Sequence, residues 1–233
     1  MTSTVSSLPR LAVFDCDGTL VDSQHNIVAA MAAAWREFGM EPAPANAVRR
    51  VVGLPLVDAI AALLPDAPRD DHQGLSEAYK KAFHALRLRP DHEEPLYPGV
   101  VAALDALAAS GALLAVATGK SRRGLLATLE RHGLTGRFVV LKTADDAPGK
   151  PNPDMLLDAM AETGVTPADT VMIGDTVFDV AMARAARTGA IGVSWGYHDP
   201  AELMAAGAHC VVDSFADLGK AISELWEKAN ATR

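Results

Sequence analysis

Six short apolar runs, each three to five residues long, recur along the chain and predict buried strands. They lie at 11–14, 113–117, 138–141, 170–173, 191–194 and 210–212. Segments with helical periodicity alternate with these runs, at 100–109, 121–132, 153–163, 177–187, 200–206 and 215–228. This alternation predicts an α/β fold with a doubly wound, Rossmann-like and mostly parallel sheet, covered by helices on both faces.

The region between the first and second predicted strands has a different pattern. Apolar residues recur at helical spacing over 22–38 and end at a glycine, in the order Ile27, Met31, Trp35, Phe38 and Gly39. The stretch 40–89 is helical by composition, is broken by several prolines and contains no convincing strand. We therefore predict an inserted all-helical domain at 21–89, and a Rossmann-like core domain formed by 1–20 together with 90–233.

Composition and charge narrow the class of protein. The chain has 233 residues, 49% of them hydrophobic, and a formal net charge of −8 with a pI of about 5.3. This acidic balance argues against nucleic acid and against an anionic membrane surface as partners. Two cysteines make no disulfide framework, and no apolar run approaches the roughly 18 residues of a membrane span. We expect a soluble cytoplasmic protein, and its oligomeric state stays open.

Polar residues follow four of the predicted strands. In a doubly wound sheet, ligands bind outside the carboxyl ends of the strands. Because these ends share one edge of a parallel sheet, we expect their polar residues to converge. They are Asp15 and Asp17 after the first strand, Thr118 and Gly119 after the second, Lys150 beyond the third, and Asp175 and Asp179 after the fourth.

Each of these residues also has an ordinary structural interpretation. Asp17 with the glycine after it is a hairpin-turn signal, and Thr118 or Asp175 can cap the helix that follows. Lys150 can be a solvated loop lysine, and Asp179 a surface acid on its helix. Their order and their shared position at strand ends favour one common site.

The predicted site needs a positive charge. Two carboxylates about 4 Å apart repel by roughly 4 kcal/mol at an effective dielectric constant of 20. Asp15, Asp175 and Asp179 bring several such charges together, and Lys150 supplies a single positive charge. Either some of the acids are protonated or a cation lies among them. Because the available ligands are oxygens, the cation that fits best is Mg²⁺.

Four sequence motifs, found in order over essentially the whole chain, resemble those of the haloacid dehalogenase superfamily of phosphotransferases. They are Asp15-Cys16-Asp17-Gly18-Thr19, Thr118-Gly119, Lys150-Pro151 and Gly174-Asp175-Thr176-Val177-Phe178-Asp179. The helical insert resembles the small α-helical cap of that family. The run from Ala117 to Gly124 resembles the phosphoglycolate phosphatase-like branch.

The resemblance implies a role for each candidate residue. Asp15 would be the nucleophile that forms an aspartyl phosphate, and Asp17 would protonate the leaving oxygen and then accept a proton from water. Mg²⁺ would bind the carboxylates of Asp15 and Asp175 and the backbone carbonyl of Asp17. The phosphoryl oxygens would be held by Thr118, Gly119 and Lys150, and Asp179 would orient Lys150 or a metal-bound water.

The implied substrate is a small phosphomonoester, with 2-phosphoglycolate as the first candidate. Arg50 in the cap is a candidate to bind its carboxylate, and an ordinary surface arginine is the alternative interpretation. A sugar-phosphate mutase, a pyrophosphatase and a nucleotidase of the same superfamily stay open. A receiver-like signalling module is an alternative from another class, although the order of its motifs disfavours it.

Overall fold

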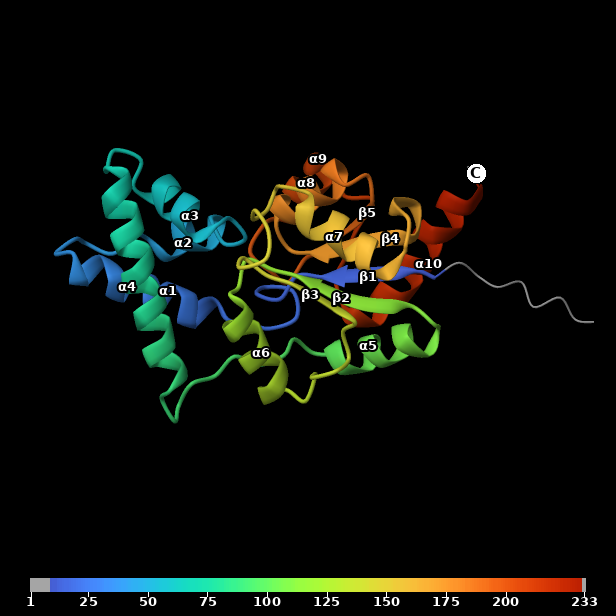
Figure 1. Ribbon diagram of the computed structural model, residues 1–233, viewed down its shortest axis with the longest axis horizontal. Helices are drawn as coiled ribbons and strands as arrows, with labels where there is room; N and C mark the ends of the chain where they lie inside the picture. The colour runs from blue at the N-terminus through green and yellow to red at the C-terminus, as the bar shows by residue number, and fades with distance from the viewer. Residues whose placement is uncertain (1–8, 232–233) are drawn as a thin grey trace, which may run out of the picture.

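The computed structural model describes residues 9–231 and places six strands in one sheet between two layers of helices (Figure 1). The sheet order is β3-β2-β1-β4-β5-β6, and every neighbouring pair of strands is parallel. This confirms the predicted doubly wound sheet. The strands are β1 (Leu11–Phe14), β2 (Leu113–Ala117), β3 (Val140–Lys142), β4 (Thr170–Gly174), β5 (Gly189–Val193) and β6 (Cys210–Val212).

Helices fill most of the remaining chain. They are α1 (Gln24–Glu37), α2 (Ala45–Arg50), α3 (Leu56–Leu63), α4 (Arg69–Arg87), α5 (Val100–Ala109), α6 (Arg122–Arg131), α7 (Asp154–Thr163), the 3₁₀ turn η1 (Pro167–Asp169), α8 (Val177–Ala185), α9 (Pro200–Ala206) and α10 (Phe215–Ala231). Across residues 9–231, none of these helices combines the length and the apolar character that crossing a bilayer requires.

The central strand β1 shows why the short apolar runs become buried strands. Successive side chains of a strand point to opposite faces of the sheet. Leu11 and Val13 pack in a cluster with α7, α8 and α9, while Ala12 and Phe14 pack in a second cluster with α5, α6 and α10. Figure 1 shows α7, α8 and α9 on one side of the sheet and α5 and α6 on the other. A strand covered on both faces needs an uninterrupted apolar run rather than an alternating pattern.

Two predicted strand positions were wrong by about two residues. The third strand begins at Val140, because Phe138 is buried against Phe14 with ring centroids 6.5 Å apart but precedes the paired residues. The fifth begins at Gly189, which pairs with Val171. A Cβ atom at Gly189 would lie 2.4 Å from a methyl carbon of Leu225 in α10. Gly189 lets α10 pack closely against the sheet. Because glycine is not a hydrophobic residue, the hydrophobic pattern does not include it in the strand.

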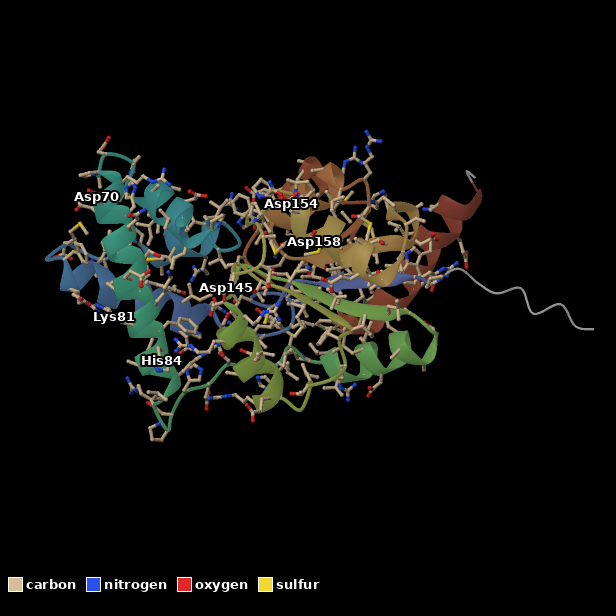
Figure 2. All side chains as sticks on the ribbon, in the orientation of Figure 1. Asp70, Lys81, His84, Asp145, Asp154 and Asp158 are labelled. Atoms are coloured by element: carbon tan, nitrogen blue, oxygen red, sulfur yellow. The ribbon has the colours of Figure 1, made fainter. Side chains whose placement is uncertain are left out.

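The helices α1–α4 occupy the insert between β1 and α5 and have an apolar cluster of their own, distinct from the two that cover the sheet. Ile27, Met31 and Trp35 belong to this cluster as their spacing predicts. Phe38 does not, because α1 ends before it and its side chain is 41% exposed. The domain boundaries at 20/21 and 89/90 stay a prediction. We call α1–α4 and their connecting loops the cap. Figure 2 shows exposed polar residues along α4, namely Asp70, Lys81 and His84.

Candidate active site

The carboxyl ends of the central strands bring the predicted acidic residues together. Asp15 directly follows β1, and its amide donates to the carbonyl of Ile173 in β4, at 2.9 Å. Asp175 directly follows β4. Both side chains are buried, as is Thr118 at the end of β2. The convergence expected from the parallel sheet is therefore present in the structure.

Lys150 lies fully buried between two acids. Its Nζ is 2.7 Å from Oδ1 of Asp15 and 2.6 Å from Oδ1 of Asp179. Burial opposes the charge on Lys150, but the two carboxylates outweigh burial and hold the pKa of this lysine above its usual value. The alternative interpretation of Lys150 as a solvated loop lysine is wrong.

Asp179 connects the start of α8 with this lysine. The hydroxyl and the amide of Thr176 both donate to Oδ2 of Asp179, at 2.7 and 3.0 Å, in a capping box at the beginning of the helix. The other carboxylate oxygen faces Lys150. Asp179 is 1% exposed, so its interpretation as a surface acid is wrong. The helix cap itself is Thr176 and not Asp175, which leaves Asp175 available for the site.

Asp175 is held by residues that the sequence analysis did not single out. The hydroxyl of Thr19 donates to Oδ1 at 2.8 Å, and the amide of Tyr197 donates to Oδ2 at 2.9 Å. The chain passes very close to this side chain: a Cβ at Gly196 would lie 2.1 Å from the Cβ of Asp175, and one at Gly18 would lie 2.3 Å from Oδ2. Gly18 also has a φ of +84°, which favours glycine. The motif position of Thr19 was the available signal; nothing in the pattern pointed to Tyr197.

The acid cluster fits a divalent cation. Asp15, Asp175 and Asp179 each offer a carboxylate oxygen, and these oxygens lie within 4.8 Å of one another. Without a cation, burial raises the pKa of Asp15 to about 6, although Lys150 works in the opposite direction. Burial, reinforced by Asp15 and Asp179, raises the pKa of Asp175 well above its usual value. A compact, buried set of oxygen donors with too little positive charge is the environment that Mg²⁺ suits.

The side chain of Asp17 lies outside this carboxylate cluster. Its Oδ1 accepts a hydrogen bond from the Ser23 hydroxyl at 2.6 Å and lies 2.5 Å from Nζ of Lys120. Burial opposes ionisation of Asp17, but Lys120 and Ser23 outweigh it and lower the pKa of the carboxyl group. The interpretation of Asp17 as part of a hairpin turn is wrong, because the chain continues into α1 rather than into a paired strand. Lys120 was not predicted; its place directly after Thr118-Gly119 was the only signal.

Thr118 is not the cap of α6. The hydroxyl of Ser121 accepts the Gly124 amide at 3.2 Å, whereas Thr118 Oγ1 accepts the amide of Lys120 at 3.2 Å. A Cβ at Gly119 would lie 3.6 Å from the carbonyl oxygen of Gly53, a cap residue. The predicted phosphate-holding residues therefore lie under the cap.

The loop between α2 and α3 forms this close contact. A Cβ at Gly53 would lie 3.1 Å from Oγ1 of Thr176, and one at Gly149 would lie 2.6 Å from Cγ of Pro55. Just before the loop, Arg50 pairs with Glu202 in α9 through two contacts, one of them 2.6 Å long. The guanidinium of Arg50 is therefore paired with a carboxylate of the core. The predicted role of Arg50 in substrate binding stays untested.

Comparison with known proteins identifies the family of this chain. A family model described as haloacid dehalogenase-like hydrolase matches residues 12–193. The chain belongs to the haloacid dehalogenase-like hydrolases. A Dickeya dadantii protein named "Probable phosphatase IndB" is 38% identical over 89% of this chain and 91% of its own length. A phosphoglycolate phosphatase of Agrobacterium fabrum is 32% identical over 93% of this chain and 94% of its own length.

Two solved structures show the same fold. A crystal structure described as a predicted phosphatase, from Clostridium acetobutylicum, has a TM-score of 0.83 at 28% identity and covers 94% of this chain and 100% of its own. A hydrolase from Pseudomonas syringae has a TM-score of 0.82 at 27% identity, with 94% and 99% covered. The predicted family, fold and phosphatase-type enzyme class are confirmed, and the receiver-like alternative is wrong. The roles of the individual site residues stay predictions.

Proposed function

We propose that the chain is a Mg²⁺-dependent phosphomonoester hydrolase that works through an aspartyl-phosphate intermediate, with 2-phosphoglycolate as its substrate. The observation that carries the proposal is the buried set of Asp15, Lys150, Asp175 and Asp179 at the carboxyl end of the sheet. The phosphoglycolate phosphatase named among the relatives supports the choice of substrate. A cytoplasmic location is part of the proposal, and the oligomeric state stays open.

The first step transfers the phosphoryl group to the protein. A carboxylate oxygen of Asp15 attacks phosphorus, the bond from phosphorus to the ester oxygen breaks, and its electron pair stays on the leaving oxygen. Asp17 gives its proton to that oxygen. Thr118, the amide of Gly119 and the ammonium of Lys150 hold the phosphoryl oxygens as charge shifts between them. The carboxylates of Asp15 and Asp175 and the backbone carbonyl of Asp17 would hold Mg²⁺, which would supply charge neutralisation for the phosphoryl group.

The second step releases phosphate. Asp17, now ionised, accepts a proton from water while the water oxygen attacks the phosphorus of the aspartyl phosphate. The bond from phosphorus to the Asp15 oxygen breaks and the carboxylate is restored. The hydrogen bonds from Ser23 and Lys120 favour the ionised form of Asp17, which the second step needs, and oppose the protonated form, which the first step needs.

The test is phosphate release from a panel of phosphomonoesters, with 2-phosphoglycolate among them, in the presence of Mg²⁺ or of a chelator. We expect many turnovers that require metal and are lost in Asp15→Asn. The matched control is Asp70→Asn, an exposed acid of the cap, which should retain the activity. Turnover that survives in Asp15→Asn would refute the proposed nucleophile, and a sugar phosphate or pyrophosphate ranked first would refute the substrate.

A further inference from the structure

Only one oxygen of the Asp17 carboxylate is engaged by the protein. Ser23 and Lys120 both contact Oδ1. Across residues 9–231, no hydrogen bond involves Oδ2. Oδ2 is therefore the oxygen free to meet the leaving group of a substrate, while the ammonium of Lys120 lies at Oδ1 of the same carboxylate.

Lys120 is a buried cation with donor capacity left. Its side chain is 7% exposed, and its Nζ lies 3.5 Å from Oε1 of Glu94 and 5.5 Å from the ring centroid of Phe83, a residue of cap helix α4. A lysine ammonium carries three protons. Asp17 and Glu94 accept from two of them at most, and a ring face satisfies a third only weakly. Because burying a cation is costly, this position favours a further anionic acceptor.

We propose that Lys120 determines specificity by pairing with a carboxylate that lies one carbon away from the ester oxygen of the substrate. The leaving oxygen must come within about 3 Å of Asp17 to receive its proton. The Lys120 ammonium is 2.5 Å from Oδ1 of Asp17, and the two oxygens of a carboxylate are about 2 Å apart, so a leaving oxygen at Oδ2 lies within about 8 Å of the ammonium. A carboxylate one carbon removed reaches about 3 Å from the ester oxygen toward the ammonium, so an ion pair forms when the leaving oxygen lies within about 7 Å of it. The inference rests on the proposed function and defines the substrate class of the same site.

The test compares two substrates within each enzyme. The quantity measured is kcat/KM for 2-phosphoglycolate divided by kcat/KM for 2-hydroxyethyl phosphate, in which a neutral alcohol replaces the carboxylate. We expect a ratio of roughly 30 to 100 in the wild type, the size of a charged hydrogen bond. The ratio should fall toward one in Lys120→Met and return in part in Lys120→Arg. Partial misfolding or a disturbed Asp17 would slow both substrates alike and leave the ratio unchanged.

Lys142→Met is the matched control, because Lys142 is a lysine of similar burial that pairs with Asp158 and Glu162 instead. Its ratio should equal that of the wild type. A ratio that stays high in Lys120→Met, or that is near one in the wild type, would overturn the inference while leaving a phosphomonoester hydrolase in place. Failure of the wild type to hydrolyse any phosphomonoester would overturn the proposed function, and this inference with it.

Discussion

In the metal-free protein, the free energy of unfolding should fall as the pH rises from 4 to 6. In the metal-free protein, burial raises the pKa of Asp15 from its ordinary value of 3.8 to about 6. Between these two values the unfolded chain releases the Asp15 proton while the folded protein still holds it. The free energy of unfolding therefore falls as the pH rises through this interval and changes no further above it. The pKa of Asp175 is shifted in the same direction.

The size of the effect follows from the shift. A difference of about two pKa units corresponds to about 3 kcal/mol, which is the destabilisation that Asp15 alone should contribute at pH 7. A cation that binds only the folded state offsets a loss of this size at moderate saturation, since a ligand at 100 times its Kd contributes about 2.7 kcal/mol. Adding Mg²⁺ should therefore restore stability at pH 7 and have little effect at pH 4.

The free energy of unfolding can be measured by urea unfolding at four pH values between 4 and 7, with chelator or with saturating Mg²⁺. The Asp15→Asn variant isolates one group, because an amide does not titrate. The difference between wild type and variant should change by about 3 kcal/mol across the interval with chelator and by much less with Mg²⁺. A difference that is flat with pH, or that rises, would show that burial does not control this carboxyl group.

Four further substitutions probe neighbouring features. Lys150→Met removes the cation between two buried carboxylates and should lower kcat at least 100-fold and the free energy of unfolding by about 3 kcal/mol at pH 7, by steady-state kinetics and urea unfolding. Gly196→Ala forces a methyl group against Asp175, so it should cost about 1–3 kcal/mol and raise the Mg²⁺ concentration for half-maximal activity. Arg50→Gln and Glu202→Gln should raise KM by the same small factor, about two- to threefold, since both break one exposed ion pair.

Each of these predictions has a control or a contrary result. Lys80→Met breaks only an exposed pair and should leave kcat and stability unchanged. Gly219→Ala adds a methyl group where no atom lies within 4 Å, so it should leave the Mg²⁺ titration unchanged. An increase in KM of tenfold or more in Arg50→Gln alone would mean that Arg50 binds the substrate, as the sequence suggested.

The sheet and its polar edge were predictable because they depend on local patterns. Strands buried on both faces need continuous apolar runs, and residues that follow parallel strands share one edge, so the convergence of Asp15, Thr118 and Asp175 needed no knowledge of packing. The start of β5 was missed because Gly189 serves a close helix contact.

The missed parts of the site depend on contacts between distant residues. Lys120 meets Asp17 across 103 positions, and Arg50 meets Glu202 across 152. Such pairs follow from how distant segments of the chain pack together, and no spacing in the sequence encodes them. Asp179 was expected to orient Lys150 or a metal-bound water, but the capping box that its other oxygen forms with Thr176 was not predicted.

The cap has an apolar cluster that shares no residue with the two clusters flanking the sheet. A substitution inside it, at Ile60 or Leu75 for example, changes the shape or stability of the cap without removing a contact from the strands that carry Asp15 and Asp175. In the proposed hydrolase, mutations of this kind would alter which leaving groups enter while the residues proposed for phosphoryl transfer stay in place. Such an arrangement lets new substrate ranges evolve at little risk to the underlying chemistry.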